Sequence, residues 1–208
     1  MAVKVLVVDD QILPRQLFES IINNAEGFEL IASINSATLA DLYCARGGVD
    51  LIIMDVVMAD GYSGLDAAFK IKKSYPTIKI IIVTSMPDAL FLAKAREIGV
   101  DSFWYKEVQD APMIDVMNRT MAGENIYPDE APEVWVGHVK NTELTDREMD
   151  VLRMLVNGYT DGEIADKLGV SYHTVRFHLN SLLTKSGCST RTDLAIQAVK
   201  SGIVVPTN

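Results

Sequence analysis

Five short runs of apolar, mostly β-branched residues alternate with helical patterns over about the first 122 residues of the chain. The runs cover residues 3–8, 28–34, 50–54, 78–84 and 102–105. Between them, apolar side chains recur every three or four residues, which is the period of an amphipathic helix. This alternation predicts a five-stranded parallel sheet with helices on both faces. Ligands of such sheets bind beyond the carboxyl ends of the strands, so the residues at those ends are the candidates for chemistry.

The pattern of the sequence changes after this region. Residues 123–143 contain Pro128, Pro132 and many polar side chains, which predicts a linker. From residue 144 onward the pattern is helical, with no strand-like run before residues 203–205. Four helix starts are marked by N-terminal capping residues, at Thr145, Thr160, Ser171 and Thr190. We therefore expect an α/β domain over residues 1–122 and a small all-α domain of four helices over residues 144–208.

The formal net charge of −9 argues against nucleic-acid binding only when the chain is taken as a whole. Residues 140–208 contain eight Lys or Arg and eight Asp or Glu, so this part is neutral. All of the excess acid lies in the first 139 residues, which hold 11 basic and 20 acidic residues. The composition therefore leaves DNA binding open for the second domain.

Two further features bear on the compartment in which the chain works. No apolar run approaches the ~18 residues of a membrane-spanning helix, and the N-terminal residues do not resemble a signal peptide. Cys44 and Cys188 are far apart and match no metal-ligand spacing, so we interpret them as ordinary reduced thiols. We expect a cytoplasmic protein with no membrane partner.

The ends of the predicted strands carry acidic, hydroxyl and basic side chains. Asp9 and Asp10 end the first strand and Asp55 ends the third. Thr84 ends the fourth strand and Lys106 the fifth. Three carboxylates that meet repel one another, and a hard divalent cation such as Mg²⁺ offsets that repulsion. A lysine and a hydroxyl facing the same point suit an oxyanion, so the combination predicts a phosphoryl group on a carboxylate beside Mg²⁺.

Each of these residues also has a simpler interpretation. Asp9 and Asp10 could cap the following helix, and Asp55 could be a loop aspartate. Thr84 could be a strand-end hydroxyl, and Lys106 could be a solvated lysine at the surface, where most lysines lie. All of these interpretations would have to hold independently, whereas one phosphate site accounts for every strand end together.

The motifs VLVVDD, LIIMDVVM, IIIVTS and SFWYK, in this order and spacing, resemble the receiver domain of two-component response regulators. The resemblance covers residues 1–122 and implies a flavodoxin-like fold. It implies that Asp55 accepts a phosphoryl group from the phosphohistidine of a sensor histidine kinase. The implied roles of the other residues are as follows: Asp9, Asp10, Asp55 and the Val57 carbonyl hold Mg²⁺, Thr84 and Lys106 contact the phosphoryl oxygens, and Phe103 is the switch aromatic. For Phe103, an ordinary strand aromatic is the alternative.

Three features depart from the receiver pattern. Ala59 stands where the family usually has proline, and the loop after Asp55 is one residue longer than usual, through residues 60–63. Glu107 follows Lys106, where proline is common. None of these changes removes a reacting group. The first two leave open an alternative function, a phosphorylation-independent regulator with a degenerate receiver.

Val57 and Met86 each lie two residues beyond a residue of the expected site. Neither apolar side chain can orient an attacking water, so we expect a phosphorylated state that lasts well beyond seconds without a phosphatase. An aspartate-nucleophile phosphatase is the rival enzyme, and it places a second acid where this chain has Val57. We therefore expect the chain not to be an enzyme.

The second domain contains LTDREMDVLRMLVNGYTDGEIADKLGVSYHTVRFHLNSLLTKSG, which resembles the LuxR-type helix-turn-helix of the NarL/FixJ subfamily. The resemblance implies a scaffold helix over residues 161–168 and a recognition helix over residues 172–185. The apolar face of the second helix, with Val175, Leu179, Leu182 and Leu183, should pack inward. The residues expected to face DNA are His173, Thr174, Arg176, Phe177, Asn180, Thr184 and Lys185, with Thr145 and Lys167 as further phosphate contacts.

A solvated helix face is the alternative for these residues, but it would leave an exposed Phe177 unexplained. Asn180 stands where many relatives carry a basic residue, so we expect weaker phosphate affinity than is usual. Because the domain is neutral, affinity should depend on dimerisation and on low salt. The resemblance implies that the final helix, over residues 192–201, forms a dimer contact through Leu194, Ala195, Ala198 and Val199; core packing is the alternative. The expected partners are a sensor kinase, double-stranded DNA with a two-fold or tandem site, and a second copy of the chain in the active state.

Together these features predict a phosphorylation-dependent, DNA-binding transcription regulator. A pure interaction protein, the third possibility, would leave the recognition helix without a purpose. Phosphate uptake and DNA binding are the two properties that separate these readings.

Overall fold

The computed structural model describes residues 2–58, 62–106, 112–204 and 206. The chain divides into two compact units. The first unit consists of Met1–Ser85 and Ala89–Ala131, and the second consists of Met86–Asp88 and Pro132–Asn208. None of the described helices is long and apolar enough to cross a membrane.

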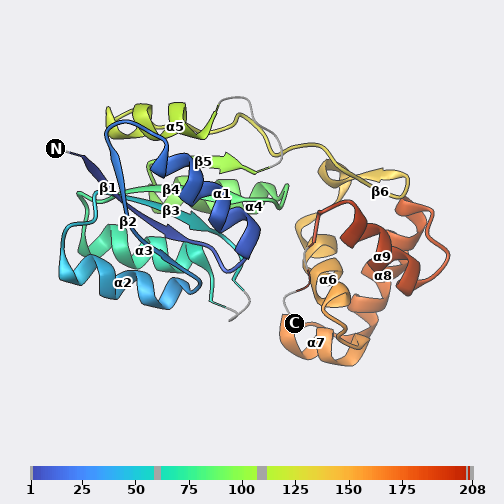
Figure 1. Ribbon diagram of the computed structural model, residues 1–208. Helices are drawn as coiled ribbons and strands as arrows, with labels where there is room; N and C mark the ends of the chain where they lie inside the picture. The colour runs from blue at the N-terminus through green and yellow to red at the C-terminus, as the bar shows by residue number, and fades with distance from the viewer. Residues whose placement is uncertain (1, 59–61, 107–111, 205, 207–208) are drawn as a thin grey trace. The chain divides into compact units, whose positions relative to one another are not determined.

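The first unit is built on a parallel sheet with the strand order β2-β1-β3-β4-β5 (Figure 1). The strands are β1 (Val3–Val8), β2 (Phe28–Ile34), β3 (Leu51–Asp55), β4 (Lys79–Thr84) and β5 (Ser102–Tyr105). All four neighbouring pairs are parallel. This confirms the predicted sheet, and the strand order is that of a flavodoxin-like doubly wound fold.

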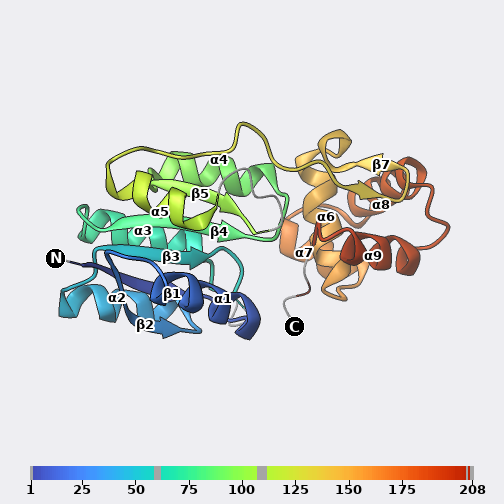
Figure 2. The same cartoon turned by 45° about the horizontal axis from the view of Figure 1, so that its top comes forward.

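Helices cover both faces of this sheet (Figures 1 and 2). They are α1 (Ile12–Asn23), α2 (Ala37–Arg46), α3 (Gly64–Ser74), α4 (Ala89–Ile98) and α5 (Met113–Met121). Residues of α1 and α5 share one core cluster with Val5, Val7 and Ile53, whereas α2, α3 and α4 share the other with Leu6 and Ile52. Successive strand residues thus point to opposite faces, and because both faces are buried the strands read as uniformly apolar runs.

The second unit is a bundle of helices whose N-termini are set by the predicted capping residues. The helices are α6 (Asp146–Val156), α7 (Asp161–Leu168), α8 (Tyr172–Ser186) and α9 (Arg191–Lys200). Thr145 and Thr160 form complete capping boxes with the glutamates three residues later, Glu148 and Glu163. Gly169 follows α7 with φ +64°, a left-handed conformation that turns the chain toward α8. The helix-turn-helix arrangement expected from the sequence is therefore present.

The expected linker over residues 123–143 is folded onto the two units. Ile126 pairs with Ser102 at the edge of β5, and the hydroxyl of Tyr127 donates to the Val100 carbonyl. In the second unit, β6 (Trp135–Val136) and β7 (Val139–Lys140) form an antiparallel hairpin, followed by a 3₁₀ turn over Asn141–Glu143. The hairpin was not predicted, because strands of two residues are too short to show a periodic pattern.

The strand-like run near the C-terminus, residues 203–205, forms no strand over its described residues. Ile203 and Val204 lie in no strand and are instead buried in the core of the second unit. Val205 lies outside the described residues. Their apolar character thus reflects core packing rather than sheet formation.

Candidate phosphoacceptor site and nucleic-acid interface

Three aspartates meet at the carboxyl edge of the sheet in the first unit. Asp9 and Asp10 follow β1, and Asp55 is the last residue of β3, the neighbouring strand. One carboxylate oxygen from each of the three lies within 4.8 Å of the others. Asp9 and Asp55 are buried. The cluster is the acidic site that the strand ends predicted, and its all-oxygen donor set suits a hard divalent cation.

Lys106 supplies the positive charge of this site. It follows β5, where its amide donates to the Thr84 carbonyl at 2.8 Å. Its Nζ lies 2.7 Å from Asp9 Oδ2 and 3.1 Å from Asp55 Oδ1, and its side chain is 9% exposed. Lys106 is therefore not a solvated surface lysine, and the simpler interpretation of this residue is excluded.

Burial and charge act in opposite directions on Asp55. Burial disfavours the carboxylate anion and is the largest effect, whereas Lys106 favours the anion and Asp9 disfavours it. The net result raises the pKa of Asp55 from 3.8 to about 7. The side chain that the sequence indicated as the phosphoacceptor thus depends on its cationic neighbour for its charge.

Thr84 lies on β4, the neighbour of β3, and Phe103 lies on β5, the next strand at the edge of the sheet. Thr84 is buried at the end of β4, one residue beyond Val83, which is the register partner of Asp55. Phe103 is buried on β5, with its ring centroid 5.0 Å from that of Tyr105 in an edge-on arrangement. Tyr105 was not among the predicted site residues. It could have been found from the two-residue spacing, which places it on the same face of β5 as Phe103.

The loop that follows Asp55 is closed tightly at its base. Val57 and Ser63 form an isolated antiparallel bridge, and the Gly64 amide donates to the Val56 carbonyl at 2.9 Å. A Cβ on Gly64 would lie 1.8 Å from the Asp55 carbonyl oxygen, so no side chain can stand at position 64. This requirement was missed from the sequence. Ala59, the other loop residues through 61, and Glu107 lie outside the described residues.

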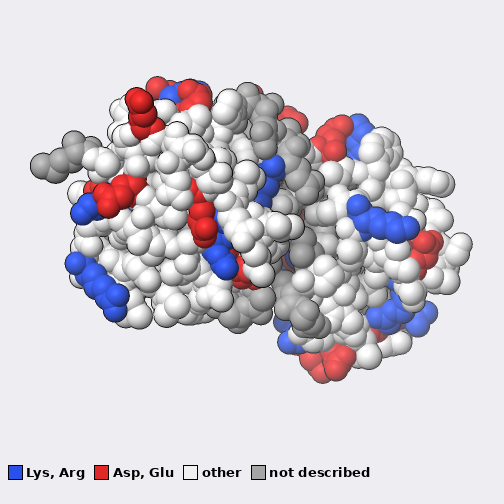
Figure 3. All heavy atoms as spheres, in the orientation of Figure 1, with Lys and Arg blue, Asp and Glu red and all other residues white. Residues whose placement is uncertain are grey.

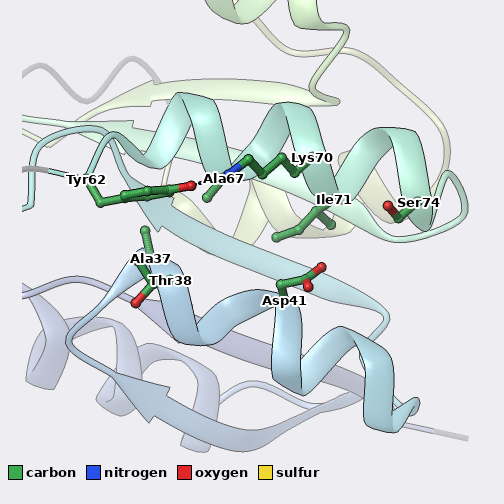
Figure 4. Close-up of a pocket in the computed structure, with 8 residues that line it drawn as sticks. All are labelled: Ala37, Thr38, Asp41, Tyr62, Ala67, Lys70, Ile71 and Ser74. Atoms are coloured by element: carbon green, nitrogen blue, oxygen red, sulfur yellow. Dashed lines mark hydrogen bonds between the residues drawn. The ribbon is translucent and has the colours of Figure 1, made fainter.

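A cavity of about 330 Å³ lies between α2 and α3 (Figure 4). Its floor contains the buried Ala37, Ala67 and Ile71, and Lys70 on its wall donates to the hydroxyl of Tyr62. None of the residues expected to bind Mg²⁺ or the phosphoryl group lines it. The candidate phosphoacceptor site is therefore the acidic cluster and not this cavity.

Helix α8, which the sequence indicated as the recognition helix, presents one buried face and one exposed face. Val175, Leu179 and Leu182 are buried in the core. The outward positions are His173, Arg176, Phe177, Asn180 and Thr184, all exposed, with Thr174 and Lys185 half-buried. Phe177 is 69% exposed, which is unusual for an aromatic side chain and favours a surface that binds a partner. A hydrogen bond with Tyr172 raises the pKa of the exposed Arg176 guanidinium.

Several of the expected phosphate contacts already have partners within the unit. Lys185 Nζ lies 2.8 Å from Glu148 Oε2 and 3.0 Å from the Glu143 carbonyl oxygen. Thr145 accepts a hydrogen bond in the first capping box, and Lys167 lies over the Tyr159 ring at 4.6 Å. These residues hold the unit together in this structure, a role that spacing along one helix could not reveal.

Glu148 is the centre of this network and was not predicted. It is 3% exposed, and besides Lys185 it accepts hydrogen bonds from Ser181 Oγ at 2.7 Å and the Thr145 amide at 2.8 Å. Burial raises the pKa of this carboxyl, but the bonds from Lys185, Ser181 and Thr145 outweigh it and lower the pKa to about 2. The network joins the N-terminus of α6 to the last turns of α8.

The four residues expected at a dimer contact on α9 separate into two groups. Leu194 and Ala198 are buried in the core of the second unit, and Ala195 packs against the same core. Val199 is exposed, as is its neighbour Ile196. Core packing, the alternative kept open for this helix, therefore accounts for Leu194 and Ala198 within one chain.

The visible face of the second unit carries basic and acidic side chains side by side (Figure 3). This mixture agrees with its equal numbers of basic and acidic residues. Binding to a polyanion therefore cannot come from a large uniform positive field and must use placed contacts, of the kind that α8 presents.

Two family models match the chain. Residues 5–118 match the response regulator receiver domain, and residues 142–198 match the bacterial regulatory proteins of the luxR family. Similar known proteins include response regulator protein VraR of Staphylococcus epidermidis, which is 30% identical over 98% of this chain and 100% of its own length. VraR of Staphylococcus aureus is 29% identical with the same coverage.

Solved structures with the same fold include two RcsB dimers bound to two parallel DNAs, with a TM-score of 0.58 and 18% identity over 96% of this chain and 98% of that chain. The response regulator ChrA of a heme-sensing two-component system aligns with a TM-score of 0.52 and 21% identity over 97% and 98%. The family models and the VraR relatives establish that the chain belongs to the two-component response regulators, as a receiver domain joined to a LuxR-type DNA-binding domain.

Proposed function

We propose that the protein is a transcription regulator whose DNA binding is controlled by phosphorylation of Asp55 by a sensor histidine kinase. One observation carries the proposal: three carboxylates and the Lys106 ammonium converge at one edge of the sheet, with Asp55 buried among them. Such a group of charges is costly to bury without a function, because each ion loses its hydration.

Phosphoryl transfer at this site follows from its charges. A carboxylate oxygen of Asp55 would form a bond to phosphorus while the bond between phosphorus and the imidazole nitrogen of the phosphohistidine breaks. The anion is the reacting form, and Lys106, at 3.1 Å, favours it against the effect of burial. Asp9, Asp10, Asp55 and the Val57 carbonyl would hold Mg²⁺, which neutralises charge on the phosphoryl oxygens when it is bound.

After transfer, Lys106 and Thr84 would bind the phosphoryl oxygens. Lys106 would then exchange its present carboxylate partners for the new group. Phe103, packed against Tyr105, would move as Thr84 is drawn inward, and this would shift the population between two states of the first unit. The role is that of a switch rather than an enzyme, since Val57 stands where a phosphatase needs a second acid.

DNA recognition would use the outward side of α8. Arg176 can bind guanine with two hydrogen bonds and Asn180 can bind adenine in the same way, while exposed Phe177 can contact a thymine methyl group. The RcsB structures describe dimers on DNA, and we propose a homodimer on a two-fold or tandem site for this chain as well. Its place of action would be the cytoplasm, where both the kinase and the DNA can reach it.

Intact-protein mass after incubation with Mg²⁺ and acetyl phosphate tests the phosphoacceptor. We expect the wild type to gain one phosphoryl group and Asp55→Asn to gain none. Asp66→Asn is the matched control, because the Asp66 side chain is exposed on the surface of α3, in an ion pair with Lys94, and its loss should leave the gain intact. A gain by Asp55→Asn equal to that of the wild type would reject Asp55 as the acceptor.

The DNA surface is tested by comparing how two variants bind a selected duplex. We expect Arg176→Ala to weaken binding to a selected duplex and to relax specificity at one position, by about 1–3 kcal/mol. Arg147→Ala, at an exposed residue of α6 outside the proposed surface, is the control and should change little. Equal losses for the two variants would argue that α8 does not read the bases.

A further inference from the structure

The hairpin of the second unit has its turn at Gly137 and His138. Trp135 pairs with Lys140 and Val136 with Val139, so these two residues connect the strands. Val136 and Val139 are both buried in the core of the unit. The turn is therefore fixed in position by the hydrophobic packing of the strands that carry it.

This turn caps the C-terminus of the recognition helix. The His138 amide donates to the carbonyl oxygen of Ser186, the last residue of α8, at 2.8 Å. The last carbonyls of a helix have no partner within the helix, so a donor from elsewhere completes them. In this chain the donor comes from a segment about fifty residues earlier, and it ties the helix end to the hairpin.

The approach of the two segments is close enough to exclude side chains. A Cβ on Gly137 would lie 2.2 Å from the Ser186 carbonyl oxygen, and the backbone at Gly137 has φ +61°. A Cβ on Gly187, just after α8, would lie 2.6 Å from His138 Nδ1. Each glycine thus packs against the other segment, and the helix end has little freedom to tilt.

A second attachment lies one residue earlier on the helix. Lys185 reaches the Glu143 carbonyl and the Glu148 carboxylate, and Ser181 donates to the same carboxylate. The last turns of α8 are therefore held by bonds from the turn, from residue 143 and from the first residues of α6. The apolar face of α8 is buried through Val175, Leu179 and Leu182. The hydrogen bonds at the end of the helix are a separate attachment that adds to this packing.

We propose that the Gly137–His138 turn is a positioning element for the recognition helix, which sets the pose of α8 in the major groove. Asn180 lies six residues before Ser186, about 9 Å along the helix axis, so a displacement of the helix end reaches the proposed base-reading residues directly. Base readout depends on donor and acceptor geometry, whereas phosphate contacts do not read sequence. The inference rests on the proposed role of α8 as the recognition helix.

The test compares Gly137→Asn with Gly158→Asn in the full chain. Asparagine tolerates a positive φ better than other residues with a Cβ, so backbone strain is kept small in both. At Gly137 the new Cβ meets the Ser186 carbonyl, while at Gly158, with φ +83°, nothing lies within 4 Å of it. Gly158 precedes α7 in the same unit and thus controls for the substitution itself.

The readout is the ratio of dissociation constants for a scrambled duplex and for a duplex selected from a random pool by the wild type. We expect Gly137→Asn to lower this ratio about tenfold, the size of one lost base contact, without weakening binding to the scrambled duplex. Gly158→Asn should keep the wild-type ratio. If Gly137→Asn also keeps it, the turn has only a structural role and the proposal is overturned.

Arg176→Ala is measured in the same series to separate this inference from the proposed function. If that variant lowers the ratio and Gly137→Asn does not, α8 reads the bases but the turn does not position it. If neither variant changes the ratio, α8 is not the recognition helix, and both proposals fail together.

Amide hydrogen exchange of the wild type decides the case in which Gly137→Asn does not fold. The turn and the helix end should open as one cooperative unit. The free energy of opening measured at the His138 amide should therefore equal that measured at the amides of the last turn of α8. Exchange of the His138 amide that is much faster than that of the helix end would overturn the proposal.

Discussion

Replacing Glu148 with glutamine should destabilise the second unit strongly, although the substitution only exchanges one carboxylate oxygen for an NH₂ group. The carboxylate is buried and accepts bonds from Lys185, Ser181 and Thr145. Glutamine presents an amide NH₂ to some of these donors and leaves the Lys185 ammonium without its counter-charge. Removing one charge of such an ion pair costs more stability than the intact pair contributes, because the other charge then has no partner of opposite sign.

The magnitude follows from the pKa of the group. The pKa of Glu148 falls from 4.5 to about 2 on folding. Each pKa unit corresponds to about 1.4 kcal/mol, so the charged form is favoured in the folded state by about 3 kcal/mol. Lys185 is about one-third exposed, and solvent screening reduces this value. We therefore expect Glu148→Gln to lower the free energy of unfolding by about 2 kcal/mol at pH 7.

The pH dependence has a definite sign. A carboxyl whose folded pKa is depressed stabilises the protein above its unfolded pKa, and this stabilisation is lost as the pH falls from 4.5 toward 2. The wild type should lose about 1 kcal/mol of this contribution between pH 7 and pH 4. The variant has no such group, so the difference between the two proteins should shrink over the same range.

Urea unfolding of the full chain measures this difference. Trp104 lies in the first unit and Trp135 in the second, so a Trp104→Phe background makes the fluorescence report on the second unit. Glu163→Gln is the matched control, since Glu163 completes the other capping box but is exposed. Equal destabilisation by the two substitutions, or a difference that stays constant down to pH 4, would refute the role assigned to the buried network.

Three further predictions concern the core and the phosphoacceptor site. Gly64→Ala places a Cβ 1.8 Å from the Asp55 carbonyl oxygen. It should therefore lower the free energy of unfolding of the first unit by roughly 3 kcal/mol or more in urea and reduce the gain of the phosphoryl group. Gly162→Ala, with open space around the new Cβ, should do neither. Leu182→Ala should cost about 2–5 kcal/mol in the same assay, because this side chain is fully buried in the core of the second unit; a loss below ~1 kcal/mol would argue against that packing. Val57→Asn should shorten the lifetime of the phosphorylated protein, followed by the decay of the added mass, because the amide can orient an attacking water; an unchanged lifetime would count against the prediction.

The grouping of charged side chains at the sheet edge could be predicted from the sequence because the parallel sheet brings strand ends together. Asp9, Asp55, Thr84 and Lys106 are far apart in the chain, but each follows a recognisable apolar run, so their convergence follows from topology alone. The helix starts at Thr145 and Thr160 were predictable for a similar reason, since a capping box is a local pattern of four residues.

Other features depend on contacts between distant segments and leave no local signal. The spacing on α8 identified Lys185 as outward-facing. It does not show that the Lys185 ammonium donates hydrogen bonds to the Glu148 carboxylate and the Glu143 carbonyl oxygen. The hairpin around Gly137 is formed by two strands of two residues, and its stability comes from burial of Val136 and Val139 in a core assembled by later helices. On α9, an apolar stripe predicts burial, but not whether Leu194 is buried within one chain or against a second.

The most direct test of the central claim measures DNA affinity in both phosphorylation states of the same preparation. The wild-type protein and Asp55→Asn are each titrated against a selected duplex, before and after treatment with Mg²⁺ and acetyl phosphate, with the phosphorylated fraction read by intact mass. We expect phosphorylation to tighten binding by the wild type, and we expect the treatment to leave the affinity of Asp55→Asn unchanged. Full phosphorylation of the wild type with no change in affinity would contradict this expectation, and would instead indicate a regulator whose DNA binding is independent of its receiver.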